Sequence, residues 1–181
     1  LCLVTGANSG IGKATVIKLV ELGAYVVMVC RDEEKAEKAK EDIITKTGSP
    51  GVEVMLADLA YQYEIREMAD HFKNKYDQLD VLINNDGTLV SKREETIEGI
   101  EKTFAVNHLA PFLLTNLLMD HLKAAPEARI INVSSEVHRM GAPVFDLSDL
   151  QLEEGFSPMK AYGVSKLCNI MFTRELAARL S

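Results

Sequence analysis

Short apolar runs alternate with segments of helical spacing along the whole 181-residue chain. The expected strands, rich in β-branched and other apolar residues, are residues 1–4, 25–29, 52–57, 80–83 and 128–133. The expected helices are residues 11–22, 31–46, 63–76, 97–122 (where Pro111 is expected to introduce a kink) and 159–180. Alternating strands and helices build a parallel sheet with helices on both faces. We therefore predict the α/β class, with a doubly wound parallel sheet in one domain over residues 1–181.

Polar or charged residues follow every expected strand. In a doubly wound sheet, ligands bind beyond the carboxyl ends of the strands, where the strand order reverses. We therefore expect the chemistry to lie in these residues, which are Thr5-Gly6, Cys30-Arg31, Asp58-Leu59, Asn84-Asn85 and Ser134-Ser135.

The overall composition excludes several classes of protein. A net charge of −7 disfavours a nucleic-acid binder, which needs a clustered basic surface. No apolar run approaches the roughly 18 residues of a membrane span, so no membrane contact is visible in the sequence.

The three cysteines (Cys2, Cys30 and Cys168) are widely spaced in apolar sequence, which predicts reduced, buried thiols in a cytoplasmic or cytosol-facing protein. The sequence lacks an initiator Met and ends in a helical pattern, so we interpret it as an excerpt whose missing parts could hold a membrane anchor.

A glycine-rich turn joins the first strand to the first helix. Gly6, Gly10 and Gly12 let the backbone approach a pyrophosphate, and the N–H groups of the helix N-terminus stabilise the anion. Glycines are common in ordinary turns as well, so this motif alone is weak. Arg31, after the second strand, suits the 2′-phosphate of NADP(H) better than the ribose hydroxyls of NAD(H). The alternatives here are a solvated arginine at a helix start and an Asp32 that caps the helix.

Tyr162 and Lys166 are four positions apart on the last expected helix, so they project from one face. An ammonium close to a phenol lowers its pKa from about 10, and the phenol can then exchange a proton with a carbonyl oxygen. Ser135 could donate a hydrogen bond to the same oxygen. An exposed helical pair is the default interpretation of this spacing taken alone.

Together these motifs resemble the Rossmann-like short-chain dehydrogenase/reductase family over essentially the whole chain. The matching pieces are residues 5–12 (TGANSGIG), 58–59 (DL), 84–87 (NNDG), 107 (N), 132–135 (NVSS) and 162–166 (YGVSK). The resemblance implies that Tyr162 is the acid–base residue, that Ser135 (with Ser134 as its rival) polarises the carbonyl, and that Lys166 assists Tyr162 and holds the ribose. It implies that Asn107 supports a proton-relay water. The implied cofactor-binding residues are Gly6, Asn8, Ser9, Gly10, Ile11, Gly12, Arg31, Asp58, Leu59, Asn85, Tyr162 and Lys166; Asn85 is also expected to brace the sheet.

Twenty-seven positions separate Ser135 from Tyr162, about twice the interval in the simplest family members. This insertion resembles the retinol-dehydrogenase-like branch, which implies NADP(H) and a small lipophilic carbonyl or alcohol such as a retinoid or steroid. The insertion could equally be a structural lid. The resemblance leaves a homo-oligomer open.

Two features depart from the family. Asp86 replaces the usual Ala, so a carboxylate is expected beside the cofactor cleft, where it either turns to solvent or weakens NADP(H) binding. The chain also ends with the helix that carries Tyr162, which predicts an open edge at the last strand. The alternative function is therefore a catalytically impaired cofactor-binding or scaffold module. The scattered histidines predict no metal site, and Ser135 lacks the sequence context of a hydrolase nucleophile.

Overall fold

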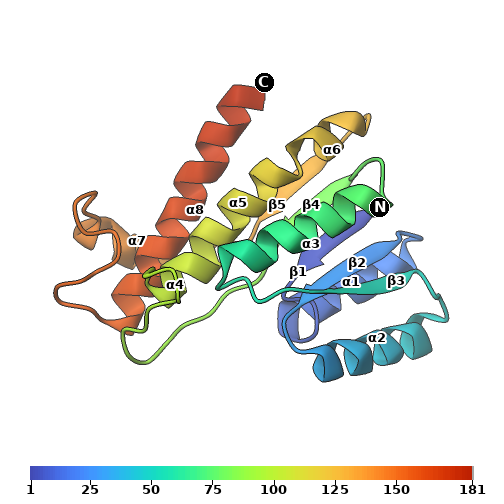
Figure 1. The fold of residues 1–181 in the computed structure, drawn as a ribbon, viewed down its shortest axis with the longest axis horizontal. Helices are drawn as coiled ribbons and strands as arrows, with labels where there is room; N and C mark the ends of the chain where they lie inside the picture. Colours follow the sequence, from blue (N-terminus) through green and yellow to red (C-terminus); the bar gives the residue numbers. More distant parts are fainter. Residues whose placement is uncertain (181) are drawn as a thin grey trace.

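The computed structural model describes residues 1–180, and within them the strands form a five-stranded parallel sheet. The strands are β1 (Cys2–Thr5), β2 (Val26–Cys30), β3 (Val52–Leu56), β4 (Val81–Asn84) and β5 (Arg129–Asn132). Their order is β3-β2-β1-β4-β5 (Figure 1). The chain moves outward from β1 to β3 and returns to β4, so the order reverses between β1 and β4. The predicted doubly wound sheet is confirmed.

Helices cover both faces of the sheet (Figure 1). Core contacts place α1 (Gly10–Glu21) and α2 (Glu33–Thr47) on one face, and α3 (Gln62–Lys75) and α5 (Ala110–Leu117) on the other. The remaining helical segments are α4 (Lys102–Phe104), the π-helical turn η1 (Ala105–Leu109), α6 (Met119–Ala124), α7 (His138–Gly141), the 3₁₀ turn η2 (Ala142–Val144) and α8 (Pro158–Leu180).

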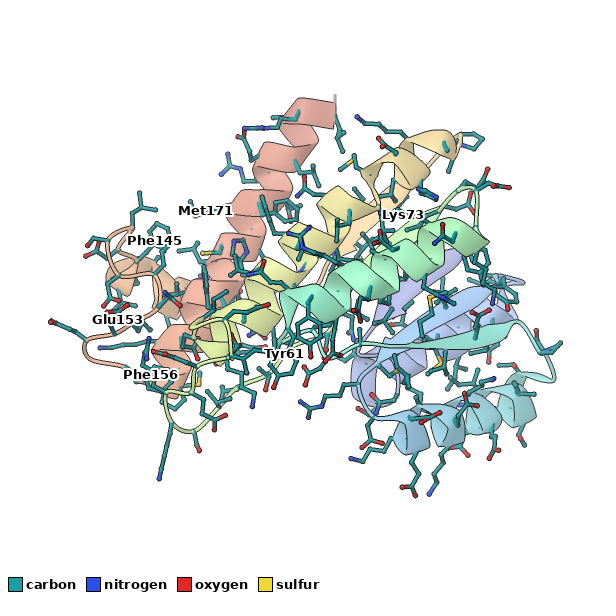
Figure 2. All side chains as sticks on the ribbon, viewed as in Figure 1. Tyr61, Lys73, Phe145, Glu153, Phe156 and Met171 are labelled. Atoms are coloured by element: carbon teal, nitrogen blue, oxygen red, sulfur yellow. The ribbon has the colours of Figure 1, made fainter. Side chains whose placement is uncertain are left out.

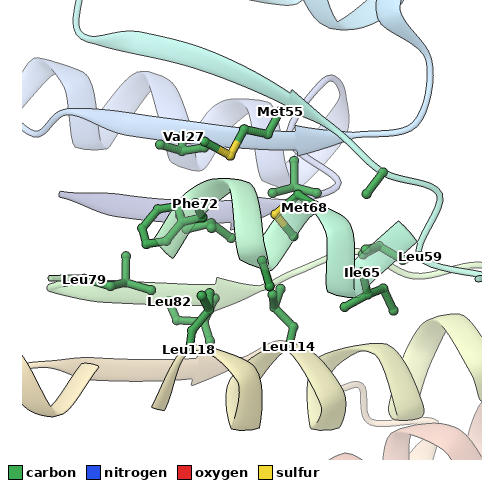
Figure 3. Packing of buried hydrophobic residues seen from close by; sticks show 14 of the residues in the cluster. Val27, Met55, Leu59, Ile65, Met68, Phe72, Leu79, Leu82, Leu114 and Leu118 are labelled. Atoms are coloured by element: carbon green, nitrogen blue, oxygen red, sulfur yellow. The ribbon is translucent and has the colours of Figure 1, made fainter. Parts of the chain in front are cut away.

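The core divides into two layers because successive side chains of a strand point to opposite faces of the sheet. Leu3 packs with the residues of α3 and α5, whereas Val4 packs with those of α1 and α2. Figure 3 shows the first layer, in which Phe72 lies among aliphatic side chains of the sheet and of α5. The three cysteines are free and buried, as predicted.

The long helix predicted for residues 97–122 is wrong in its bounds and its continuity. Gly99 has a φ of +74°, which an α-helix does not accommodate, so residues 96–100 form a turn instead. Helix α4 begins only at Lys102, because the buried Glu101 carboxylate caps it by accepting from the N–H groups of Thr103 and Phe104. The helical path then continues to Ala124, with a break at Leu118.

The π-helical turn η1 lies just before Pro111. Proline has no N–H, so the carbonyl of Asn107 lacks the donor that an α-helix would supply from four residues further on. Asn169 of α8 provides that donor instead, from Nδ2 at 2.7 Å. The predicted disturbance at Pro111 therefore takes the form of a π turn stabilised by a side chain from another helix.

The insertion between Ser135 and Tyr162 packs against α4 and α8, where Phe145 contacts the small core around Phe104. Figure 2 shows Phe145, Glu153 and Phe156 along this segment, beside α7 and the start of α8. A Cβ on Gly141 would lie 2.4 Å from the Gly163 carbonyl group. The insertion therefore touches α8 backbone to backbone, one residue after Tyr162.

Candidate active site

The loops after β1 and β4 lie side by side where the strand order reverses. Thr5 Oγ1 accepts hydrogen bonds from the N–H groups of Asn85 and Asp86, each at 3.0 Å. Asn85 Nδ2 donates to the carbonyls of Thr5 at 2.9 Å and Gly6 at 3.3 Å. Asn85 thereby fastens the glycine turn to the end of β4.

The glycine turn requires glycine for two different reasons. Gly6 has a φ of +62°, and a Cβ there would lie 2.7 Å from Asp86 Oδ1. A Cβ on Gly12 would lie 2.2 Å from the Gly6 carbonyl oxygen. At Gly10, where α1 begins, the structure places no described heavy atom within 4 Å of the Cβ position. The first turn of α1 also carries no acidic side chain, so an anion can approach its N–H groups.

A cleft of about 320 Å³ runs along this turn and the ends of β2, β3 and β4. Its lining includes five of the predicted cofactor-binding residues, namely Gly6, Asn8, Ser9, Arg31 and Asp58. Asp86 also lines it, at the place that the family resemblance implies. Lys35, Thr88 and Lys102 also line it, although no motif in the sequence singled them out. Lys35 lies on the first turn of α2, and its closeness in sequence to Arg31 is the signal that could have pointed to it.

Asp32 caps helix α2 and lies in the wall of the cleft. Its Oδ1 accepts from the Lys35 N–H at 3.0 Å, and its Oδ2 lies 2.9 Å from Lys35 Nζ. Hydrogen bonds from the side chain and backbone of Lys35 hold the pKa of Asp32 below its ordinary value. The neighbouring Arg31 is exposed at the wall of the cleft. The wall of the cleft therefore presents the guanidinium of Arg31, next to the Asp32 carboxylate, which is already bonded to Lys35.

Lys166 is almost completely buried, with 3% of its surface exposed. Its Nζ donates to the Val133 carbonyl at 3.0 Å and lies 5.5 Å from the ring centroid of the half-buried Tyr162. Burial lowers the pKa of Lys166, and the negative charge of Asp86 opposes that change. The predicted shared face of Tyr162 and Lys166 is thus a buried contact, not an exposed helical pair.

The two serines after β5 have different partners. Ser134 Oγ donates to the Lys166 carbonyl at 2.9 Å, so its proton is committed to α8. Ser135 Oγ accepts from the Val137 N–H at 3.3 Å. A hydroxyl that accepts one hydrogen bond retains its own proton for donation. This difference favours Ser135 over Ser134 as a donor to a substrate oxygen.

Asn107 is fully buried in the π turn. Its Oδ1 accepts from the Thr88 N–H at 2.7 Å, and its Nδ2 donates to the Thr88 carbonyl and to Ser165 Oγ, each at 3.0 Å. Ser165 Oγ in turn donates to the Tyr162 carbonyl at 2.8 Å. Asn107 therefore ties the loop after β4 to the helix that carries Tyr162, and its support of a relay water stays a prediction.

Seven predicted cofactor-binding residues are absent from the lining of the cleft, namely Gly10, Ile11, Gly12, Leu59, Asn85, Tyr162 and Lys166. Leu59 is 5% exposed and packs in the core with the residues of α3. Ile11 lies on the first turn of α1 and is 71% exposed. Leu59 can therefore contact a ligand only through its backbone atoms, whereas Ile11 can also do so through its exposed side chain.

Neither a metal centre nor a membrane span was found among residues 1–180. No group of three or more His, Cys, Asp or Glu side chains there could hold a metal ion. None of the helices in this range has both the length and the apolar character needed to cross a bilayer.

Comparisons with known proteins identify the family of this chain. The model of the short chain dehydrogenase family matches residues 1–147. Human retinol dehydrogenase 12 is 44% identical over 178 residues, which cover 98% of this chain and 56% of that enzyme. The chain thus spans little more than half the length of the curated relatives it matches.

Solved structures agree with the sequence relatives. A crystal structure of an uncharacterised protein from Mycobacterium paratuberculosis superposes with a TM-score of 0.84 at 38% identity, covering 99% of this chain and 62% of that one. A short chain dehydrogenase from Escherichia coli, complexed with NADPH, superposes with a TM-score of 0.78 at 26% identity, covering 98% of this chain and 70% of that one. The chain belongs to the short-chain dehydrogenase family, and within it resembles the retinol dehydrogenases.

Proposed function

We propose that the protein is an NADP(H)-dependent oxidoreductase that transfers hydride between nicotinamide and a carbonyl or alcohol. The observation that carries the proposal is the buried ammonium of Lys166, 5.5 Å from the ring centroid of Tyr162. Burying an ammonium is costly, so a lysine held inside the protein beside a phenol is a candidate for a functional role, here the stabilisation of a phenolate.

The residues of this chain handle the proton of the reaction. In the reducing direction the Tyr162 hydroxyl donates its proton to the carbonyl oxygen, and in the oxidising direction its phenolate takes the proton back. The Ser135 hydroxyl donates a hydrogen bond to the same oxygen. Lys166 favours the phenolate by its charge and holds the ribose, while Asn107 orients α8 and supports a relay water. When bound, the nicotinamide supplies or accepts the hydride.

The cleft fits a dinucleotide at its phosphate end. The backbone of residues 6–12 would hold the pyrophosphate, since the space at Gly10 is open and the first turn of α1 carries no acid. Arg31 would contact the 2′-phosphate of NADP(H), with Lys35 nearby in the same wall. Asp58 would lie near the adenine. These cations, with Asp32 engaged by Lys35, support NADP(H) over NAD(H).

A lipophilic aldehyde or ketone, such as a retinoid or a steroid, is the proposed substrate class. The sequence relatives named retinol dehydrogenases support this choice. The apolar side chains of the insertion, which meets α8 next to Tyr162, are compatible with it. A cytosol-facing location and a homo-oligomer stay predictions.

A consumption assay tests the proposal on the full-length protein. NADPH absorbance is followed with a panel of lipophilic aldehydes and ketones that includes retinal, and each substrate is repeated with NADH. We expect turnover with at least one lipophilic carbonyl, and faster turnover with NADPH than with NADH. Bound NADPH that is never oxidised across the panel would refute an oxidoreductase.

That refuting outcome is the one expected from a second candidate, a cofactor-binding or scaffold module without turnover. The observation that favours the module is the carboxylate of Asp86 in the cofactor cleft. The contacts of Tyr162, Lys166 and Ser135 favour the enzyme.

A further inference from the structure

Asp86 occupies a position in the cleft where an anion is unexpected. Its Oδ1 lies 2.7 Å from the place that a Cβ on Gly6 would take, and it accepts from the Gly87 N–H at 2.9 Å. The carboxylate therefore stands against the glycine turn. On the function proposed above, on which this inference rests, the pyrophosphate of the cofactor approaches the same turn.

The charges around Asp86 come from three other parts of the fold. Arg31 after β2 and Lys166 of α8 favour the ionised carboxylate, while Asp58 after β3 disfavours it. Burial is the largest influence, and it raises the pKa of Asp86 above its ordinary value. Burial also raises the pKa of Cys30 to about 11, and Asp86 adds to that rise, so this neighbour stays a neutral thiol.

The remaining cations of the cleft already have carboxylate partners. Lys35 Nζ lies 2.9 Å from Asp32, and Lys102 Nζ lies 3.0 Å from Glu94. Arg31 is the residue proposed for the 2′-phosphate. A dinucleotide in the cleft would therefore bring at least two phosphate charges close to Asp86 without supplying a new cation to it.

We propose that Asp86 is an affinity-determining residue of the cofactor cleft, and that its carboxylate takes up one proton from solvent when the anionic dinucleotide binds. The proton forms the carboxyl O–H bond on binding and returns to solvent on release. A neutral carboxyl removes the repulsion and leaves the carbonyl-type oxygen free to accept from Gly87.

The pH dependence follows from the direction of this proton transfer. At low pH the free cleft already holds the neutral carboxyl, so the affinity for the cofactor is at its highest. As pH rises above the pKa of Asp86 in the free cleft, binding must recruit the proton from increasingly dilute solution, and the affinity falls. A variant with a permanently neutral side chain keeps its affinity.

The test compares full-length wild type with Asp86→Asn, which keeps the shape and the acceptor oxygen without the charge. The matched control is Asp77→Asn, which removes the same charge from an exposed position in the loop before β4, at the opposite edge of the sheet. NADPH and NADH binding are measured by titration calorimetry in two buffers of different ionisation enthalpy, over a pH series that runs from acid to weakly alkaline solution. NADH lacks the 2′-phosphate. The proton uptake measured with NADH therefore contains no contribution from the titration of that phosphate.

We expect Asp86→Asn to bind NADPH about tenfold more tightly than wild type at the alkaline end of the series, with a difference that shrinks toward the acid end. Wild type and Asp77→Asn should take up more protons than Asp86→Asn with both dinucleotides. Binding by all three proteins with the same affinity and the same proton uptake would overturn the role of Asp86 and leave the proposed cofactor intact. Absence of NADPH and NADH binding in all three would overturn the proposed function together with this inference.

Discussion

At the scale of single residues, charges that lie close together define the chemistry of this cleft. The guanidinium of Arg31 is exposed at its wall, the carboxylate of Asp86 stands against the glycine turn, and the buried ammonium of Lys166 lies beside Gly87 in the loop after β4. Each charge has a consequence that can be measured separately, because each belongs to a different part of the proposed mechanism.

Replacing Arg31 by Ala should weaken NADPH binding far more than NADH binding. A charge-assisted hydrogen bond to a phosphate contributes about 1.5–3 kcal/mol, so we expect a loss of roughly 10- to 100-fold for NADPH. NADH lacks the 2′-phosphate and should lose little. Fluorescence titration of both cofactors measures the two effects.

The control for Arg31 is Arg179→Ala, which removes an equal charge at the last turn of α8. Arg179 forms an exposed pair with Glu175, and such pairs contribute little to stability. Equal losses of NADPH and NADH affinity in Arg31→Ala would contradict the proposed contact with the 2′-phosphate.

Asp86 should also make the stability of the protein depend on pH. Burial raises the pKa of Asp86 in the folded state, so the folded protein holds this proton more strongly than the unfolded chain. The resulting penalty is absent below the ordinary carboxyl pKa of about 3.9 and grows as pH rises through the raised value. Asp86→Asn should therefore melt at a higher temperature than wild type at neutral pH, with a difference that disappears in acid.

Thermal denaturation of the two proteins, followed by circular dichroism over a pH series, measures this difference. Asp77→Asn should melt like wild type throughout. A variant Asp86→Asn that is less stable than wild type at neutral pH would mean that the carboxylate is needed by the fold.

The sequence predicted single residues well where a motif carries its own geometry. The positions of Gly6 and Gly12 in a tight turn follow from the motif, because only the absence of a Cβ permits these contacts. The buried place of Leu59 does not follow from the motif, since burial depends on helices that are distant in sequence. For the same reason Thr88 and Asn169, which hold Asn107, could not be found from spacing.

At the scale of elements, two contacts position the helix that carries Tyr162. Asn169 of α8 donates to the carbonyl of Asn107 in the π turn, and Gly163 of α8 meets Gly141 of α7. The sequence predicted the start of α8 to within one residue of its observed bound at Pro158. It did not predict that α8 is held by the close contact between Gly163 and Gly141 and by the hydrogen bond from Asn169 to the carbonyl of Asn107.

Gly141→Ala should loosen the insertion from α8. The backbone of Gly141 has a φ of −74°, so alanine is not strained there, and the whole cost comes from the contact with the Gly163 carbonyl. Overpacking of this kind costs about 1–3 kcal/mol of unfolding free energy. Chemical denaturation measures the loss, and turnover should fall with it because Tyr162 adjoins the contact.

Ala142→Ser, at the next and exposed position, is the control for Gly141→Ala and should leave stability within about 0.5 kcal/mol. Wild-type stability of Gly141→Ala would show that the insertion is not held against α8 in the way described.

At the scale of the whole molecule, the parallel strands bring residues from distant parts of the chain together at the carboxyl end of the sheet. Alternating strands and helices with right-handed crossovers predicted a doubly wound parallel sheet, and the structure gives its strand order as β3-β2-β1-β4-β5. The break in the helical path between Lys102 and Ala124 was not, because it depends on Gly99, on Pro111 and on a side chain of α8. Local pattern predicts which elements form, and tertiary contacts decide where they begin and bend.

One comparison tests most directly whether the residues at the carboxyl end of the sheet perform acid–base chemistry on a carbonyl. Turnover and NADPH affinity are measured for full-length wild type and Tyr162→Phe, which removes one hydroxyl and keeps the ring beside Lys166. We predict that turnover falls by about 100-fold or more while NADPH affinity is retained. Turnover at the wild-type rate in Tyr162→Phe would contradict the mechanism.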